Sequence, residues 1–208
     1  IRRLTLVDRA QPLADLAGDA RVAVVEGDLL ALLSAHREAV VPKDADAVVH
    51  LAAAVSAECE ADFDLGLRSN LHAMQALLER VRALGTRPTF VFASSLAVFG
   101  DTPEQPLPAV ITDTTLPTPQ SSYGIQKFIG EQLVADYARK GYLRGRSTRL
   151  MTVSVRPGRP NGAASGFLSG IIREPLAGIR AVCPVPPDTP IALASPIAFV
   201  RDMLLRSH

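Results

Sequence analysis

Short apolar runs recur along the chain and are separated by polar or helix-like stretches. Each run spans four to six residues and is rich in valine, leucine, alanine or phenylalanine. Such runs are typical of strands that are covered on both faces, as in a parallel sheet. The pattern predicts five buried strands, over residues 4–7, 22–25, 47–51, 89–93 and 150–155.

Two longer segments between these runs carry apolar residues at steps of three and four, the spacing of one helix face. The first covers residues 62–84 and the second residues 122–142, and each ends near a glycine, Gly85 or Gly141. The first stripe consists of Leu67, Leu71, Met74, Leu77, Leu78 and Val81. The second consists of Ile125, Ile129, Leu133, Val134 and Tyr137. Strand and helix alternate, which predicts an α/β fold with a doubly wound, Rossmann-like parallel sheet.

The regular pattern stops after Arg156, where prolines and glycines become frequent. Residues 1–156 are therefore expected to form the sheet-containing domain. Residues 157–208 are expected to form loops and short helices over the edge of the sheet.

Composition narrows the possible functions. The 208 residues include 22 basic and 21 acidic side chains, a formal net charge of +1, and no basic cluster interleaved with aromatics, so nucleic acid is not expected as a partner. No apolar run approaches the roughly 20 residues of a membrane helix, so no membrane partner is expected either. The two cysteines, Cys59 and Cys183, lie far apart and no spacing resembles a metal site. A cytoplasmic location and an absence of bound metal are the expectations.

Tyr123 and Lys127 form the sharpest chemical motif. Four residues apart on a helix, they project from one face, so the ammonium can lie beside the phenol. A tyrosine with a pKa of about 10 needs a depression of about 3 units, or about 4 kcal/mol, to act as a base near neutrality. With three tyrosines and three lysines in the chain, chance predicts roughly 0.04 such pairs. The alternative is a solvated helix pair.

A second motif lies at the end of the fourth apolar run, where Ser94 and Ser95 follow a strand-like stretch. Ligands of open α/β sheets bind at the carboxyl ends of strands. The two serines therefore strengthen the interpretation of Tyr123 and Lys127 as site residues.

In their order along the chain, these motifs resemble the extended short-chain dehydrogenase/reductase family, which includes epimerases and dehydratases of nucleotide sugars. The resemblance covers nearly the whole chain and implies a Rossmann-like fold with NAD as cofactor. It rests on Leu6-Val7-Asp8, Gly27-Asp28-Leu29, His50-Leu51-Ala52-Ala53, Asn70, Ser94-Ser95, Tyr123 with Lys127, and Arg156-Pro157.

The resemblance implies a role for each matching residue. Tyr123 would be the general base, Lys127 would hold the nicotinamide ribose and lower the pKa of the tyrosine, and Ser95 would hydrogen-bond the reacting hydroxyl. The residues expected to bind the cofactor are Asp8, Asp28, Leu29, Leu51, Ala52, Ala53, Asn70, Ser94, Lys127 and Pro157. For Ser94 the alternative is a strand-end cap, and His50 is expected to be structural.

Asp8 bears on the choice of dinucleotide. An acidic side chain after this strand can accept both adenosine ribose hydroxyls, which favours NAD. The adjacent Arg9 could instead lie near a 2′-phosphate.

The tail carries a narrower resemblance, to the D-erythronate dehydrogenase branch of the family. It lies in residues 155–161, 163–167, 170–176 and 182–189, and it implies oxidation of the C2 hydroxyl of a short sugar acid. A guanidinium fork suits a carboxylate, so Arg173, or failing that Arg159, is expected to bind the acid group. The other expected substrate-binding residues are Ser56, Ser95, Tyr123, Asn161 and Ser165.

Two other functions stay open. One is a nucleotide-sugar epimerase or dehydratase that uses the same serine, tyrosine and lysine. The other is a nucleotide-binding protein without catalysis. The family resemblance also implies a homodimer in which the two long helices pair across a two-fold axis.

The chain departs from the family at one motif. No G-x-G-x-x-G or G-x-x-G-x-x-G sequence occurs, although this loop cradles the pyrophosphate, and Asp8 should follow it by about 20 residues. The first strand, glycine loop and first helix, about 30 residues, are therefore expected upstream of Ile1.

Overall fold

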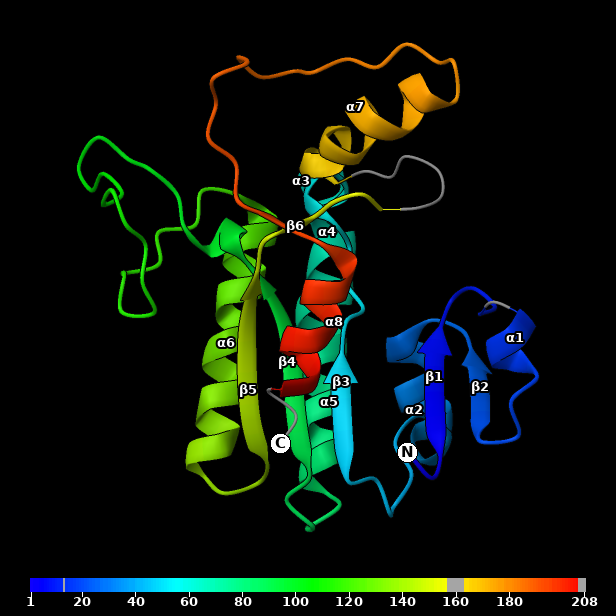
Figure 1. The fold of residues 1–208 in the computed structure, drawn as a ribbon. Helices are drawn as coiled ribbons and strands as arrows, with labels where there is room; N and C mark the ends of the chain where they lie inside the picture. The colour runs from blue at the N-terminus through cyan, green and yellow to red at the C-terminus, as the bar shows by residue number, and fades with distance from the viewer. Residues whose placement is uncertain (13, 157–162, 206–208) are drawn as a thin grey trace.

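A computed structural model describes residues 1–12, 14–156 and 163–205 (Figure 1). The strands are β1 (Leu4–Asp8), β2 (Val22–Glu26), β3 (Ala47–His50), β4 (Thr89–Ser95), β5 (Arg144–Leu150), β6 (Thr152–Val153) and β7 (Leu193–Ala194). The α-helices are α1 (Ala14–Ala17), α2 (Leu29–Val40), α3 (Ser56–Ala61), α4 (Phe63–Gly66), α5 (Ala73–Arg82), α6 (Ser122–Arg139), α7 (Phe167–Leu176) and α8 (Pro196–Leu205). Shorter turns of helix are the π-helical η1 (Leu67–His72) and the 3₁₀-helical η2 (Leu96–Val98) and η3 (Ala164–Gly166).

The strands pair in parallel throughout the described residues. β1 pairs with β2, and β3, β4 and β5 form a sheet in that order, in which Ala47 of β3 and Arg144 of β5 both align with Thr89 of β4. The predicted Rossmann-like α/β fold is confirmed. All these strands run the same way, so their carboxyl ends meet at one edge, where the candidate site lies.

The central strand β4 is covered on both faces. Phe90 and Phe92 pack with α2, α5 and α6 in the main core, while Val91 and Ala93 pack with Met203 of α8 on the other side. In Figure 1, α5 and α6 lie behind the sheet and α8 in front of it. This two-sided burial explains why β4 reads as a continuous apolar run.

Helix α2 joins the β1–β2 pair to the larger sheet. Leu33 and Val40 of α2 belong to the main core, against which Val7 of β1 also packs. The guanidinium of Arg80 in α5 donates two hydrogen bonds, of 3.0 and 2.6 Å, to the carbonyl of Val41, which caps the end of α2. A helix end leaves carbonyls without partners, so this contact fixes α2 on α5.

Strands β1 and β3 each keep a free edge within the described residues. In Figure 1, β1 lies on the side of β2 that faces β3, and the topology assigns no strand between them. Two apolar side chains near this edge are exposed, Val49 at 49% and Leu51 at 54%. Both belong to a run that predicts a fully buried strand.

Two predicted elements need correction. The fifth sheet strand is β5, Arg144–Leu150, rather than residues 150–155. Its sequence, RGRSTRL, has no apolar run because several of its side chains are solvated or ion-paired, while the apolar residues after Leu150 contribute only the two-residue β6. The predicted helix over residues 62–84 is three consecutive segments, α4, η1 and α5, with a π-helical turn in the middle.

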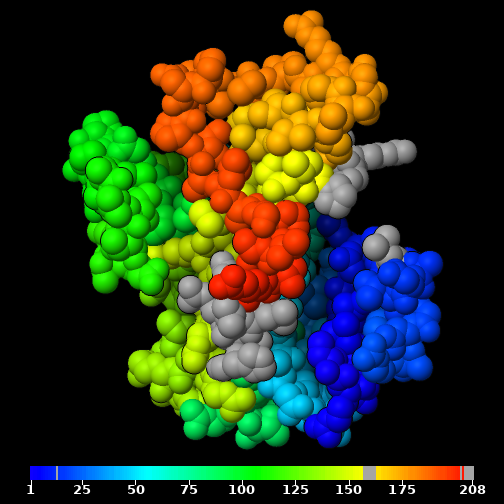
Figure 2. Space-filling view, viewed as in Figure 1, coloured from blue at the N-terminus to red at the C-terminus, as the bar shows by residue number. Residues whose placement is uncertain are grey.

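The tail after residue 162 contains α7, β7 and α8, and β7 pairs with β6, which precedes the tail. In Figure 2, this segment, coloured yellow to red, lies between the loop of residues 101–120 and the β1–β2 pair. Phe199 and Met203 of α8 contact the sheet, which anchors the tail to the domain.

Candidate active site

Helix α6 begins beside the end of β4, and local sequence fixes its start. The Ser121 hydroxyl accepts a hydrogen bond of 3.1 Å from the Gly124 amide, which caps the helix. A Cβ on Gly124 would lie 2.1 Å from the carbonyl oxygen of Ala97. Only glycine permits this approach, which brings Tyr123, in the first turn of α6, next to the segment that follows Ser95.

Ser95 and Tyr123 are brought together at this point. Ser95 ends β4, and its hydroxyl caps η2 by accepting a hydrogen bond of 3.1 Å from the Ala97 amide. The same hydroxyl interacts with the Tyr123 phenol and acts to lower its pKa. A substrate hydroxyl placed here would meet two side-chain oxygens from two different elements.

Lys127 completes the group and is 3% exposed. Its ammonium donates a hydrogen bond of 2.8 Å to the carbonyl of Ala93 and lies 5.6 Å from the centre of the Tyr123 ring and 4.8 Å from that of Phe92. Burial lowers the pKa of Lys127 to about 8. The three residues expected to be catalytic therefore surround the carboxyl end of β4.

The pKa of Tyr123 does not move in the expected direction. Burial raises it, the hydrogen bond from Ser95 opposes that rise, and the nearby Cys59 adds to it. Lys127 was expected to depress this pKa, but its ammonium is itself buried, which weakens its charged form, and it is hydrogen-bonded to Ala93. The net direction of the shift is upward.

The residues expected around the adenosine lie at the carboxyl ends of β1 and β2. Asp8 is exposed, and one of its carboxylate oxygens accepts a hydrogen bond of 3.0 Å from the Ala10 amide. Asp28 is exposed and caps α2 by accepting a hydrogen bond of 3.1 Å from the Ala31 amide, while Leu29 is half-buried. The Asp28 carboxylate thus has a structural role as a helix cap, whether or not it also binds a ligand.

The loop after β3 presents small side chains at the same edge. Leu51 and Ala52 are exposed and Ala53 is half-buried. Pro157, which was also expected near the cofactor, lies outside the described residues.

Ser94 and Asn70, also expected near the cofactor, are committed to protein partners. The buried Ser94 hydroxyl donates a hydrogen bond of 2.5 Å to Glu131, which favours the structural alternative for this serine. The Asn70 side chain accepts a hydrogen bond of 2.9 Å from the Ala54 amide and donates one of 3.1 Å to the Ala54 carbonyl. Asn70 therefore holds the loop after β3 in place.

The expected substrate-binding residues are dispersed. The Ser56 hydroxyl accepts a hydrogen bond of 2.9 Å from the Ala164 amide, which ties α3 to η3, where Ser165 is half-buried. Arg159 and Asn161 lie outside the described residues.

Arg173 is not a free cation. Its guanidinium donates one hydrogen bond of 2.9 Å to the Arg156 carbonyl and one of 2.5 Å to the Glu174 carboxylate. This ion pair was not expected from the sequence, and it neutralises the charge that was expected to bind a substrate carboxylate. A guanidinium has five N–H donors, so two hydrogen bonds leave capacity for an anion.

Comparison with known proteins identifies the family of this chain. The sequence matches the NAD dependent epimerase/dehydratase family over residues 2–200. The chain belongs to that family.

Two relatives within this NAD-dependent epimerase/dehydratase family are named D-erythronate dehydrogenase. The one from Cupriavidus necator is 54% identical over 206 residues, and the one from Haemophilus influenzae is 42% identical over 201 residues. These matches cover 98% and 97% of this chain but only 60% and 62% of the relatives. The chain therefore spans about three fifths of their length.

A solved structure of the family is also similar. It is described as a nucleoside-diphosphate-sugar epimerase from Agrobacterium tumefaciens, with a TM-score of 0.87 and 42% identity, and the match covers 100% of this chain and 60% of that one. The predicted family and the NAD cofactor of the family are confirmed.

The candidate site also contains several residues that no sequence motif indicated. Gln126, between Tyr123 and Lys127, is buried and accepts a hydrogen bond of 2.8 Å from Asn70. Glu131 accepts the hydrogen bond from Ser94 and pairs with Arg149 at 2.8 Å. Glu131 lies four residues after Lys127, so helical spacing could have revealed that it shares a face with Tyr123 and Lys127.

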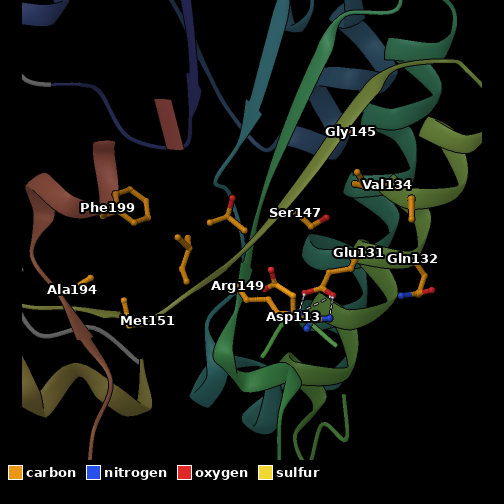
Figure 3. Close-up of a pocket in the computed structure, with 13 residues that line it drawn as sticks. Asp113, Glu131, Gln132, Val134, Gly145, Ser147, Arg149, Met151, Ala194 and Phe199 are labelled. Carbon is orange, nitrogen blue, oxygen red and sulfur yellow. Dashed lines mark hydrogen bonds and ion pairs between the residues drawn. The ribbon is translucent and has the colours of Figure 1, made fainter. Parts of the chain in front are cut away.

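A cavity of about 460 Å³ opens beside β5 and does not include Ser95, Tyr123 or Lys127. Figure 3 shows Arg149 and Glu131 in its wall, joined by their ion pair, with Phe199 on the opposite side. Among the described residues, no cluster of His, Cys, Asp and Glu is arranged to hold a metal ion. No helix in that part of the chain has the length and apolar character needed to cross a membrane.

Proposed function

We propose that this chain forms most of the NAD-binding domain, and part of the substrate-binding portion, of a dehydrogenase that oxidises the C2 hydroxyl of a short sugar acid such as D-erythronate. The observation that carries the proposal is the convergence of Ser95, Tyr123 and Lys127 at the carboxyl end of β4. The names of the two relatives at 54% and 42% identity support the substrate class.

The domain division follows from this assignment. Residues 1–156 supply the sheet and the catalytic side chains, and residues 157–208 supply substrate-binding loops and short helices. The free edges of β1 and β3, with the exposed Val49 and Leu51, support a further parallel strand between them.

The described residues fit NAD at the edge where they gather. The exposed Asp8 carboxylate can accept hydrogen bonds from the adenosine ribose hydroxyls. The side chains of Leu51, Ala52 and Ala53 are small enough for a cofactor to pass close to the backbone of the loop after β3. Lys127 would hold the nicotinamide ribose, since an ammonium has three donors and the hydrogen bond to the Ala93 carbonyl uses one of them. When bound, NAD supplies the acceptor for the hydride from C2.

The side chains of this chain handle the proton. Ser95 would orient the substrate hydroxyl, and the Tyr123 oxygen would accept the proton that this hydroxyl loses. Burial holds the pKa of Tyr123 up, so the phenol is neutral before the reaction. Formation of the phenolate therefore depends on positive charge nearby, from Lys127 and from the oxidised nicotinamide.

The first experiment measures NADH formation by absorbance with the full-length protein. D-erythronate should reduce NAD, whereas the uncharged polyol erythritol should not. Tyr123→Phe should lower kcat at least about 100-fold while NAD still binds, because only the proton acceptor is lost. An unchanged kcat in this variant would refute the role of Tyr123.

The same assay separates the second candidate, a nucleotide-sugar epimerase, which the name of the similar Agrobacterium structure favours. Interconversion of UDP-sugars without net release of NADH would make this the better function. A protein that binds NAD but turns over neither class would be a nucleotide-binding protein without catalysis.

Arg173 is proposed to bind the substrate carboxylate alongside its contact with Glu174. Arg173→Ala should raise KM for D-erythronate at least about 10-fold and change kcat less, because the carboxylate is held before and during the reaction. Arg173→Lys should recover part of the loss. Unchanged KM in the alanine variant would mean that Arg173 serves only the tail, through Glu174 and Arg156.

Three further assignments are part of the proposal. The full-length protein is a homodimer. Its location is cytoplasmic, which two free cysteines, Cys59 and Cys183, favour. No metal takes part in the reaction.

A further inference from the structure

Gln126 lies at the centre of a buried polar network that the catalytic motif does not explain. It is 2% exposed and stands between Tyr123 and Lys127 on the inner face of α6. A Cβ on Gly66 would lie 2.7 Å from its amide nitrogen, so Gln126 is packed directly against the end of α4. The side chain thus fills the contact between the catalytic helix and the α4–η1 segment.

The orientation of its amide follows from its partners. The Ala54 amide donates to the Asn70 oxygen, so the Asn70 nitrogen must be the group that faces Gln126. That nitrogen can only donate, and Gln126 must therefore present its oxygen, at 2.8 Å. The orientation of the Gln126 amide is therefore determined both by which neighbouring atoms donate or accept hydrogen bonds and by packing.

A continuous chain of hydrogen bonds results. It runs from the Ala54 backbone, in the loop after β3, through Asn70 of η1 to Gln126 of α6. At one end lie Leu51, Ala52 and Ala53, the proposed cofactor loop. At the other end lie Tyr123 and Lys127. The contact of Asn70 with Gln126 is the shortest of the three that the Asn70 nitrogen makes, the others being 3.1 Å to Ala54 and 3.3 Å to Cys59.

The nitrogen of Gln126 is buried and has no hydrogen-bond partner among the residues that the structure describes. An apolar side chain of similar size would avoid this uncompensated donor, so packing alone does not account for glutamine here. The oxygen of the same amide is the functional half. In this buried position it gives the Asn70 nitrogen a nearer acceptor than the Ala54 carbonyl or the Cys59 sulfur.

We propose that Gln126 is a positioning residue that locks the loop after β3 to the catalytic helix through Asn70. In the proposed function, on which this inference rests, the loop would lie against the cofactor and the helix carries Tyr123 and Lys127. Their relative placement then decides whether Tyr123 meets the substrate hydroxyl. Small displacements of such groups lower the rate strongly.

The test compares Gln126→Met with Gln132→Met in the full-length protein. Methionine keeps the length of the side chain but removes the acceptor, and Gln132 is an exposed residue of the same helix. Gln126→Met should lower kcat at least about 10-fold and raise the Kd for NAD at least about 3-fold. Gln132→Met should leave both values within about 2-fold of wild type. Wild-type kcat and Kd in Gln126→Met would overturn the proposal.

A readout without cofactor tests the network itself. Amide hydrogen exchange of Ala54 should become at least about 10-fold faster in Gln126→Met, because Asn70, which accepts its hydrogen bond, no longer has a fixed orientation. Unchanged exchange at the Ala54 amide would also overturn the proposal. A merely structural role would lower Tm but leave kcat and the Kd for NAD of the folded protein unchanged.

Two further variants guard against a folding defect. Gln126→Glu keeps an oxygen toward Asn70 and should restore kcat to within about 3-fold of wild type; a glutamate variant as slow as the methionine variant would show that the acceptor is not what matters. Gly66→Ala displaces the Gln126 amide without changing its chemistry and should lower kcat in the same way, so a wild-type rate there counts against the proposal even if Gln126→Met does not fold. If wild type binds NAD but oxidises no sugar acid, the proposed function fails, and the exchange and Kd measurements still decide the role of Gln126.

Discussion

At the scale of single residues, burial sets the chemistry around the end of β4. Burial raises the pKa of the Tyr123 phenol and lowers the pKa of the Lys127 ammonium to about 8. Both shifts favour neutral forms, because a charged group loses hydration in a low-dielectric site. In the proposed reaction, positive charge must therefore come from Lys127 and from the oxidised nicotinamide ring, which couples catalysis to cofactor binding.

His50 shows the same effect at the end of β3. It is buried, stacks on Phe92 at 5.8 Å, and has its pKa lowered to about 3, first by burial and then by the charge of Lys127. This environment fits the structural role expected for His50.

A prediction for acid stability follows. The folded-state pKa of His50 is below that of an unfolded histidine, about 6.5, so the unfolded state binds the proton first as the pH falls. His50 should therefore remove stability as the pH drops from about 6.5 to about 3, by at most about 1.4 kcal/mol per pH unit. Denaturant unfolding of wild type and His50→Leu at several pH values should show a smaller acid slope in the variant. Parallel slopes would contradict the buried neutral state of His50.

At the scale of elements, glycines and buried polar pairs decide how α6 meets the sheet. Gly124 lets the helix start against Ala97, and Gly130 lets it pass Phe92, whose ring would lie 2.7 Å from an added Cβ. Glu131 then joins α6 to β4 through Ser94 and to β5 through Arg149. These contacts place Tyr123 and Lys127 relative to Ser95.

The Glu131–Arg149 ion pair should contribute far more to the free energy of unfolding than an exposed ion pair on α6. Glu131 is almost fully buried, whereas Arg139 and Asp136 form an exposed pair near the end of α6. Arg149→Met should lower the free energy of unfolding by about 3–5 kcal/mol, because it leaves a buried carboxylate without its counter-charge. Arg139→Met, the matched control, should cost less than about 1 kcal/mol. Similar losses in the two variants, measured by urea denaturation, would show that Glu131 is solvated in solution.

Prediction from sequence succeeded where one physical signal dominated. The buried strand β4 and the long helix α6 follow from hydrophobic pattern alone, and helical spacing places Tyr123 beside Lys127. The strand β5 was missed because its arginines are stabilised by ion pairing and solvent, which the pattern does not record. Ser94 hydrogen-bonds to Glu131, which lies 37 positions away, and Arg173 pairs with Glu174, the next residue. Neither contact follows from a sequence motif.

At the scale of the whole molecule, the exposed apolar surface differs between the two long helical segments. Met74, Leu78 and Val81 of α5 are fully buried in the core of the domain. They are therefore not available for the dimer contact that was expected of this stripe. On α6, in contrast, Ile125 is 46% exposed and Ile129 is 39% exposed.

The proposed homodimer should consequently depend on α6. Ile125 and Ile129 lie one turn apart, so a two-fold axis beside this face would bring each pair against its copy. Ile129→Arg should convert the full-length dimer into a monomer at micromolar concentration, because facing arginines repel each other and the charge opposes burial. Light scattering gives the mass, and the exposed Val110→Arg change, on the loop of residues 101–120, serves as the control with unaltered assembly. A wild-type monomer would reject the homodimer, and a dimer that survives Ile129→Arg would place its interface on another face.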